Sequence, residues 1–349
     1  MRTLWAPTHE REHDVTTPGE GEAPLVNLAE ITEVELLIVK RMREFTMGEH
    51  RSLFHGSGFD FVGLREWEAG DRFSSIDWPQ STLTNFSPLI VREFEQPSTA
   101  SVIVVADGSL STRCGVDGIP IAAAIARAIA TIGMSAVFFQ DVFGLMTFTT
   151  PGAPVPQSSA VDPAARRPAG APAPGPGSAE SWHLAAVRPR IGKNQVIHCL
   201  DAYQYQRGLQ SMKESDGLSR SIAGFMRKTS LVPVISDFLF DEPRDVLREL
   251  ADLNSSHDVF LVLIDAAFAF EVPKVSAGWI EAFDVETGRS RVMSRAALGK
   301  LASRVRDWQN DVERIAKASG LDVLRLGLDQ KDSVIQLTEF VMERRLRKK

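Results

Sequence analysis

Oxygen-bearing side chains follow two apolar runs of the chain. The run at residues 101–106 leads into Asp107, Ser109 and Ser111, which place an oxygen at every second position. Asp237 follows a second, similar run. Carboxylate and hydroxyl oxygens are the ligands that hard divalent cations such as Mg²⁺ and Mn²⁺ prefer. These four side chains are therefore candidate metal ligands, provided that the fold brings the ends of the two runs together.

The apolar runs predict the strands of an α/β sheet. Both are short and rich in β-branched residues, which is typical of strands buried inside a sheet. Residues 119–134 predict a helix, so this region has the strand, turn and helix of an open α/β sheet. The second and third predicted strands, residues 136–139 and 145–148, are separated by a short turn, which favours an antiparallel hairpin. The six main strands are predicted to begin at Ser101, Ala136, Leu145, Leu231, Val259 and Val323.

The order of these strands decides whether the candidate ligands meet. In the common doubly wound order 3-2-1-4-5-6, the first and fourth strands are neighbours and the order reverses between them. Asp107 and Asp237 end these two strands, so both carboxylates are expected to face one crevice. Two like charges that lie close together resist joint burial without a cation. The alternative is a simple turn in which Asp107 and Ser109 only cap local backbone groups, as these residue types commonly do.

Composition limits the class of protein. The chain has 349 residues, of which 44% are hydrophobic and 24% charged, with a formal net charge of -6. These values are typical of a soluble globular protein, and the negative charge argues against general nucleic-acid binding. We expect no apolar run to reach the roughly 18 residues that span a bilayer. The first residues lack the apolar centre of a signal peptide, so we expect a cytoplasmic protein.

Changes in composition divide the chain into three predicted parts. Residues 1–27 are polar and acidic and predict a disordered tail. Residues 28–98 predict a helix followed by a β-rich segment, and residues 99–349 predict the α/β domain. Within that domain, proline, alanine and glycine dominate residues 151–181, which predicts a disordered insertion. Residues 279–293 predict a hairpin. A further strand is predicted at residues 182–187, and further helices at residues 196–205, 218–228, 243–253, 296–319 and 333–346.

Two groups of residues resemble known families. The pentapeptide Asp107-Gly108-Ser109-Leu110-Ser111 resembles the metal-ion-dependent adhesion site of von Willebrand factor A domains. Residues 56–78 resemble the signature of the bacterial "domain of unknown function 58" family, and the resemblance extends from about residue 30 to the C-terminus. The matching motifs are Gly56-Ser57-Gly58, Phe59-Asp60-Phe61, Leu64-Arg65-Glu66-Trp67, Gly70-Asp71, Ile76-Asp77-Trp78, Arg92-Glu93-Phe94-Glu95 and Asp284-Val285-Glu286-Thr287-Gly288.

This resemblance implies a fold and a function. The fold is a von Willebrand factor A-like (Rossmann-like) α/β domain, with an open, mostly parallel sheet, helices on both faces and a β-rich N-terminal addition. The function is that of a non-enzymatic adaptor or co-chaperone whose partner is a MoxR-type AAA+ ATPase. The family motif assigns Asp107, Ser109, Ser111 and Asp237 to a Mg²⁺ or Mn²⁺ ion that accepts a partner carboxylate. The motif also uses a threonine, which has no match at residues 191–195.

Two other functions stay open. The first is a metal-free scaffold that keeps only the fold, which the missing threonine favours. The second is a Mg²⁺-dependent hydrolase. Against the hydrolase, no histidine is placed as a base for Ser109, and the chain has neither G-x-S-x-G nor a phosphate-binding P-loop.

Overall fold

The computed structural model describes residues 24–47, 60–68, 71, 73, 76–95, 99–113, 115–116, 119–149, 182–212, 217–226, 228–240, 243–270, 279–284, 289–327 and 330–347. Most of the predicted tail and all of the predicted insertion, residues 151–181, lie outside these described residues. The chain divides into two compact units, one of Lys40–Thr99 and one of Met1–Val39 with Ala100–Lys349.

A mostly parallel sheet forms the centre of the larger unit, and its described strands run in the order β13-β10-β9-β3-β6-β7-β8. Neighbours from β13 to β6 are parallel, whereas β7 is antiparallel to both β6 and β8. The predicted adjacency of the first and fourth main strands, β3 and β9, is confirmed, and β10 and β13 follow beyond β9 in the predicted order. The order 3-2-1 on the other side is wrong, because residues 136–138 belong to α3 and the predicted third strand, β6, lies directly beside β3. The strands are β3 (Ser101–Asp107), β6 (Val142–Thr149), β7 (His183–Arg190), β8 (Gln210–Ser211), β9 (Ser230–Ser236), β10 (Asp258–Ile264) and β13 (Asp322–Leu326).

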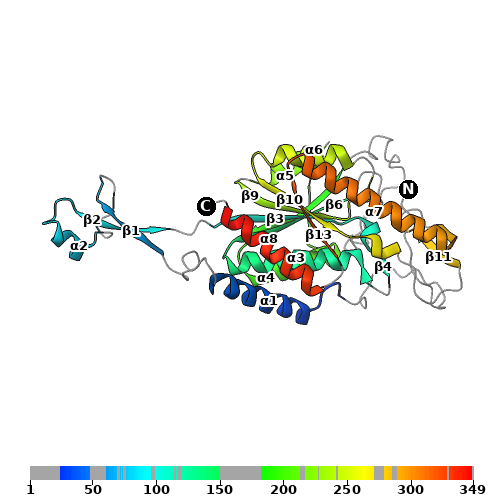
Figure 1. Cartoon of the computed structure of the whole chain (residues 1–349), viewed down its shortest axis with the longest axis horizontal. Helices are drawn as coiled ribbons and strands as arrows, with labels where there is room; N and C mark the ends of the chain where they lie inside the picture. The colour runs from blue at the N-terminus through cyan, green and yellow to red at the C-terminus, as the bar shows by residue number, and fades with distance from the viewer. Residues whose placement is uncertain are drawn as a thin grey trace, which may run out of the picture. The chain divides into compact units, whose positions relative to one another are not determined.

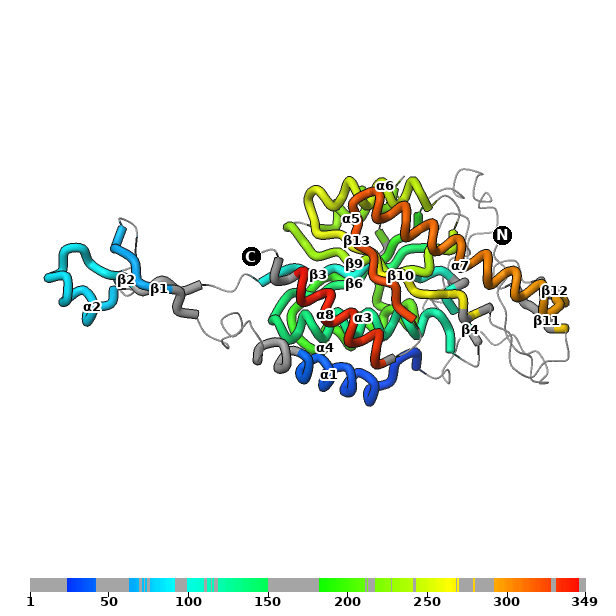
Figure 2. Tube along the Cα trace, viewed as in Figure 1, coloured from blue at the N-terminus to red at the C-terminus, as the bar shows by residue number. Residues whose placement is uncertain are grey.

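Helices cover both faces of this sheet (Figures 1 and 2). On one face lie α5 (Leu218–Phe225), α6 (Pro243–Leu253) and α7 (Arg295–Ala318), and their apolar residues share one core with every second residue of the strands. The other face carries α3 (Ile121–Phe138), α4 (Lys193–Tyr205) and α8 (Gln330–Arg347), with α1 (Leu28–Met47) beyond them. Shorter elements are η2 (Leu110–Arg113), β4 (Gly115–Val116), β5 (Ile119–Pro120) and η3 (Ala267–Phe270).

The predicted strand at residues 136–139 is wrong, because α3 continues to Phe138. After the helix, Gln140 adopts a φ of 58°, and the amide of Asp141 donates to the carbonyl of Ala136 at 2.8 Å. The next strand, β6, then pairs parallel to β3 rather than forming a hairpin with a preceding strand. A helix buried on most sides has no polar stripe, so periodicity cannot distinguish its last turn from a short buried strand.

The expectation that no segment is apolar enough to span a bilayer is also wrong. By length and composition α3 passes this test, with a window at Ile121–Phe138. However, 83% of that window is buried inside the protein. The apolar composition of α3 is therefore that of a helix packed between the sheet and other helices.

The smaller unit contains a two-stranded antiparallel sheet of β1 (Asp60–Glu66) and β2 (Ile90–Glu95), together with the helix α2 (Trp78–Leu83). Asp77 caps α2 by accepting a hydrogen bond from the amide of Gln80 at 3.3 Å. Arg65 donates two hydrogen bonds of 2.7 Å to the carboxylate of Asp71. In this β-rich segment an ion pair thus fixes a turn.

The predicted hairpin at residues 279–293 is present as β11 (Trp279–Asp284) and β12 (Arg289–Ser294), which pair antiparallel. Ser294 then caps α7, because its hydroxyl accepts a hydrogen bond from the amide of Ala297 at 3.2 Å. The hairpin therefore continues directly into α7.

Gly133 of α3 packs closely against Val196 of α4, and its replacement tests this packing. A Cβ at Gly133 would lie 2.7 Å from Cγ1 of Val196 and 3.1 Å from Cζ of Phe143. Overpacking costs about 1–3 kcal/mol, and alanine returns up to about 1 kcal/mol of helix propensity. We expect Gly133→Ala to lower the unfolding free energy by about 1–2 kcal/mol in urea denaturation. Gly299→Ala is the control, since nothing lies within 4 Å of its Cβ, and it should stabilise by about 0.5–1 kcal/mol. Equal effects of the two changes would contradict the packing.

The Arg65–Asp71 pair predicts an acid-sensitive turn. The hydrogen bonds from Arg65, and then that from the amide of Glu68, lower the pKa of Asp71 from 3.8 to about 2. A lowered carboxyl pKa in the folded state contributes stability above the unfolded pKa, and this contribution is lost as the pH falls through the folded pKa. We expect the carboxyl resonance of Asp71 to titrate near 2 by NMR, and to return toward 3.8 in Arg65→Ala. An unchanged midpoint in that variant would show that the pair does not set this pKa.

Candidate functional site

The carboxyl ends of β3 and β9 lie side by side at the point where the strand order reverses. The two strands are parallel neighbours, and Ala106 pairs with Ile235. The next residues along each strand are Asp107 and Ser236, which end β3 and β9. In open α/β sheets, ligands bind beyond this edge at such a reversal.

Asp107 is the most enclosed charged group at this edge, with 0% of its surface exposed. Its Oδ1 accepts hydrogen bonds from the amide of Ser109 at 2.9 Å and from the Ser109 hydroxyl at 2.5 Å. Its Oδ2 accepts a hydrogen bond of 2.7 Å from the hydroxyl of Ser236. Hydrogen bonds from hydroxyl and amide donors are what a buried carboxylate needs. The turn after β3 and the end of β9 are therefore joined through one carboxylate.

Asp237 follows Ser236 directly and is 1% exposed. Its Oδ1 accepts a hydrogen bond from the amide of Leu239 at 3.1 Å. The Ser236 hydroxyl, besides donating to Asp107, accepts a hydrogen bond from the amide of Phe238 at 2.9 Å. Of the four predicted ligands, Asp107 and Ser109 are joined directly, and Asp237 directly follows the serine that donates to Asp107. Ser111 lies in η2, and its side chain is outside the described residues.

Tyr203 of α4 supports the turn that follows β3, from the face of the sheet that carries α3, α4 and α8. Its hydroxyl donates to the carbonyl of Asp107 at 2.9 Å. Burial is the largest cause that raises the pKa of this hydroxyl, and the nearby cation of Arg113 opposes the rise. The carboxylates of Asp107 and Asp237 both add to the rise in pKa. Both carboxylates therefore lie within electrostatic reach of a single hydroxyl.

Two adjacent residues of α7 hold the loop that carries Asp237. The side-chain amide of Gln309, which is fully buried, donates to the carbonyl of Asp237 at 2.9 Å and to that of Ile264 at 2.8 Å. The indole of Trp308 donates to the carbonyl of Phe238 at 2.8 Å. These hydrogen bonds attach the turn after β9 to α7.

The sequence-based site left out Ser236, Tyr203 and Gln309. Ser236 had a detectable signal, since it is the last residue of the fourth main strand and directly precedes a predicted ligand. Tyr203 and Gln309 lie 96 and 72 residues from the backbone groups of Asp107 and Asp237 that they contact. Neither belongs to a motif, so no local pattern identifies them.

The donor chemistry of this edge fits a hard divalent cation. Two carboxylates and the hydroxyls of two serines supply only oxygen ligands. Within the part of the chain that the structure describes, no group of three or more His, Cys, Asp or Glu residues gathers as a metal-binding cluster. Any cation here would therefore depend on hydroxyls or on ligands from outside the chain.

Thr149 is the threonine at the end of the neighbouring strand β6. It is 6% exposed, and its Oγ1 has no hydrogen-bond partner among the described residues. Phe148 pairs with Asp107, and its carbonyl accepts a hydrogen bond from the amide of Gly108 at 2.8 Å. Because side chains alternate along a strand, Thr149 faces the opposite side of the sheet from Phe148. The structure therefore does not assign Thr149 to the ligand set.

Comparison with known proteins gives one family match. Residues 63–166 match the family described as protein of unknown function DUF58. The matched segment includes the smaller unit's hairpin from Gly63 onward, together with β3, α3 and β6. Asp107, Ser109 and Ser111 lie inside it and Asp237 lies beyond it.

One solved structure resembles the chain only remotely. The crystal structure of the conserved hypothetical protein BatB from Bacteroides thetaiotaomicron is similar at 13% sequence identity and a TM-score of 0.33, covering 70% of this chain and 99% of that chain. This similarity is too remote to support a statement about fold or function. No curated protein matches the chain.

Removing the hydroxyl of Ser236 tests the link between the two strand ends. A hydrogen bond to a charged group contributes about 1.5–3 kcal/mol, and its loss leaves part of a buried carboxylate unsatisfied. We expect Ser236→Ala to lower the unfolding free energy by about 1.5–3 kcal/mol in urea denaturation. Ser303→Ala is the control, since that exposed hydroxyl bonds only to the carbonyl of Gly299. It should change stability by less than about 0.5 kcal/mol. A loss no larger than the control would exclude the link.

Proposed function

We propose that this chain is a non-enzymatic protein-interaction module that binds Mg²⁺ or Mn²⁺ where β3 meets β9. Asp107 and Asp237 are the anionic ligands, and Ser109, Ser111 and Ser236 supply hydroxyls. The observation that carries the proposal is the position of Asp107. Its carboxylate lies at the switch point of the sheet, bonded to Ser109 on one oxygen and to Ser236 on the other.

The cation would give this edge a position that accepts a carboxylate from another protein. The chain's own residues hold the ligands in place. Tyr203 anchors the carbonyl of Asp107, and Gln309 anchors that of Asp237. Ligands held by such supporting hydrogen bonds lose little conformational freedom when a cation binds.

The implied partner is a MoxR-type AAA+ ATPase, for which the chain would act as an adaptor or co-chaperone in the cytoplasm. The resemblance of residues 56–78 and of Asp107–Ser111 to known families supports this partner. The adjacency of β3 and β9 supports the finer assignment of a von Willebrand factor A-like domain, since such a sheet has its crevice between the first and fourth strands.

Burial of the serine argues against the hydrolase alternative. Ser109 is 0% exposed, and its hydroxyl donates to Asp107. A nucleophilic serine needs access to a substrate and a base that orients it. A binding function requires only that the edge open far enough to admit one carboxylate oxygen.

One observation favours the metal-free scaffold as a second candidate. Both oxygens of Asp107 already accept hydrogen bonds from hydroxyl groups of the chain. A buried carboxylate that is bonded in this way can remain in the folded protein without a cation. The two candidates therefore differ in a single measurable property, which is the affinity for a divalent cation.

Calorimetric titration with MgCl₂ and MnCl₂ separates these candidates. We expect the wild-type chain to bind the cation, and Asp107→Asn and Asp237→Asn each to abolish binding, because each removes an anionic ligand. Ser109→Ala should weaken binding less, since a neutral hydroxyl contributes less than a carboxylate to a hard cation. Asp265→Asn is the control, because that carboxylate follows β10 and pairs with Arg325.

A pull-down of a MoxR-type ATPase, with and without EDTA, then tests the partner. Capture that EDTA and Asp107→Asn both abolish supports the module. If wild-type protein binds neither cation, or if Asp237→Asn binds as well as wild type, the metal site is wrong and the scaffold takes its place.

A further inference from the structure

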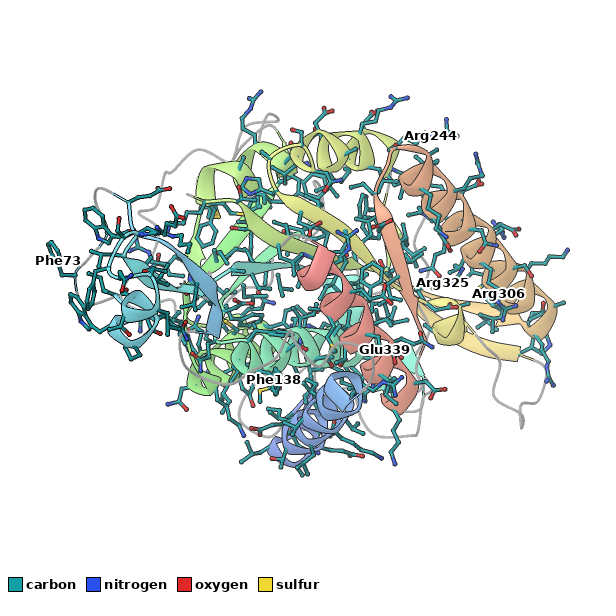
Figure 3. The ribbon with its side chains drawn as sticks, turned by 60° about the vertical axis from the view of Figure 1, so that its left-hand side comes forward. Phe73, Phe138, Arg244, Arg306, Arg325 and Glu339 are labelled. Carbon is teal, nitrogen blue, oxygen red and sulfur yellow. The ribbon has the colours of Figure 1, made fainter. Side chains whose placement is uncertain are left out.

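The N-terminal half of α7 carries an unusual distribution of charge. Its cationic residues are Arg295, Lys300, Arg304 and Arg306, and the first acidic residue of the helix is Asp307. The side chain of Arg306 is labelled on α7 in Figure 3. The first turn contains no acidic residue. The positive end of the helix dipole makes a cation in the first turn unfavourable, and this applies to Arg295.

The C-terminal half of the same helix shows the usual pattern. There Lys317 pairs with Glu313 at 2.7 Å and Arg314 pairs with Asp311 at 2.8 Å. By contrast, Lys300 and Arg304 make no ion pair with any described residue. They lie four positions apart, where like charges repel each other on a helix surface. The repulsion between these two cations is therefore a local cost, and proteins retain such costs mainly at functional surfaces.

Lys300, Arg304 and Trp308 form one stripe along the outer side of α7, which we call the α7 stripe. They recur every four residues, so they lie on one side of the helix. The inner side consists of the buried residues Leu298, Ala302, Val305 and Gln309. Trp308 is 39% exposed, and its indole donates to the carbonyl of Phe238. The stripe therefore ends at the loop that carries Asp237.

We propose that the α7 stripe receives an acidic segment of a partner protein. Lys300 and Arg304 pair with the carboxylates of this segment, and the exposed face of Trp308 packs against one of its apolar side chains. The segment then lies beside the turn that follows β9. That it also delivers a carboxylate to a cation held by Asp107 and Asp237 rests on the function proposed above. The pairing of the α7 stripe with acidic residues does not rest on that function.

Other polyanions fit this surface less well. The whole chain has a formal net charge of -6, which repels a nucleic acid or an anionic membrane over distance. Nucleic-acid binding commonly rests on about 6–10 phosphate contacts, and the stripe offers two cations. An acidic peptide needs few cations and gains from an aromatic neighbour.

A charge reversal tests the stripe in the full-length chain. The probe is a fluorescein-labelled peptide of alternating glutamate and leucine, titrated at low salt and read by fluorescence anisotropy. We expect Lys300→Glu to weaken its binding about tenfold, since it replaces an attraction with a repulsion. The same change should keep or raise the melting temperature. A glutamate at this position can pair with Arg304, four residues further along the helix.

Lys317→Glu is the matched control on the same helix. It makes the same change in net charge but breaks the pair with Glu313 and places an anion near the helix C-terminus. We expect it to lower the melting temperature slightly and to leave peptide binding unchanged. Equal weakening by both variants would mean that net charge alone drives binding and would overturn the proposal. Strong binding by Lys300→Glu would overturn it as well.

Repeating the titration with EDTA separates this inference from the metal site. If the protein binds no cation but Lys300→Glu still weakens peptide binding, the metal site fails and the stripe stands. If a cation binds and Lys300→Glu has no effect, the stripe fails and the metal site stands.

A preference for nucleic acid is tested by competition with single-stranded DNA. Displacement of the labelled peptide by DNA at a lower concentration than by free acidic peptide would contradict the proposed partner.

Discussion

The candidate site depends on the burial of one carboxylate, that of Asp107. Removing a charge from water costs several kcal/mol unless hydrogen bonds or an opposite charge replace the lost hydration. Here the replacement comes from Ser109 on the same turn and from Ser236 on the neighbouring strand. The ends of β3 and β9 are therefore joined by a charge that neither could bury alone. A divalent cation or a set of hydroxyls can meet this requirement, and both are compatible with the same strand order.

The helix α7 links this edge to the rest of the sheet. Gln309 bonds to the carbonyls of Asp237 and Ile264, so one side chain holds the ends of β9 and β10. Its carbonyl oxygen accepts a hydrogen bond from the amide of Ala266 at 3.3 Å. Buried amides that are fully bonded in this way specify one arrangement, because any displacement leaves a polar group unsatisfied. The loop of Asp237 consequently moves only if α7 moves with it.

The two halves of α7 have different surfaces because they meet different requirements. The C-terminal half pairs its charges within the helix, as an ordinary solvent-exposed helix does. The N-terminal half follows the hairpin of β11 and β12 and leaves Lys300 and Arg304 facing water beside Trp308. An acidic partner would relieve the repulsion between the two cations. The same helix would then connect a partner-binding surface to the turn that supplies Asp237.

The sequence by itself determined that β3 and β9 are neighbours, and two of the groups that meet at this switch point. The apolar, β-branched runs of β3 and β9 and the carboxylate after each sufficed, because parallel strands place their carboxyl ends at one edge. The tertiary structure decided what local patterns could not. It showed that residues 136–138 continue α3, since a helix packed on most sides lacks periodicity. It also placed Ser236 against Asp107, across 129 residues of chain, and Gln309 against Asp237. Such contacts arise from the packing of distant segments, so no pattern within one segment encodes them.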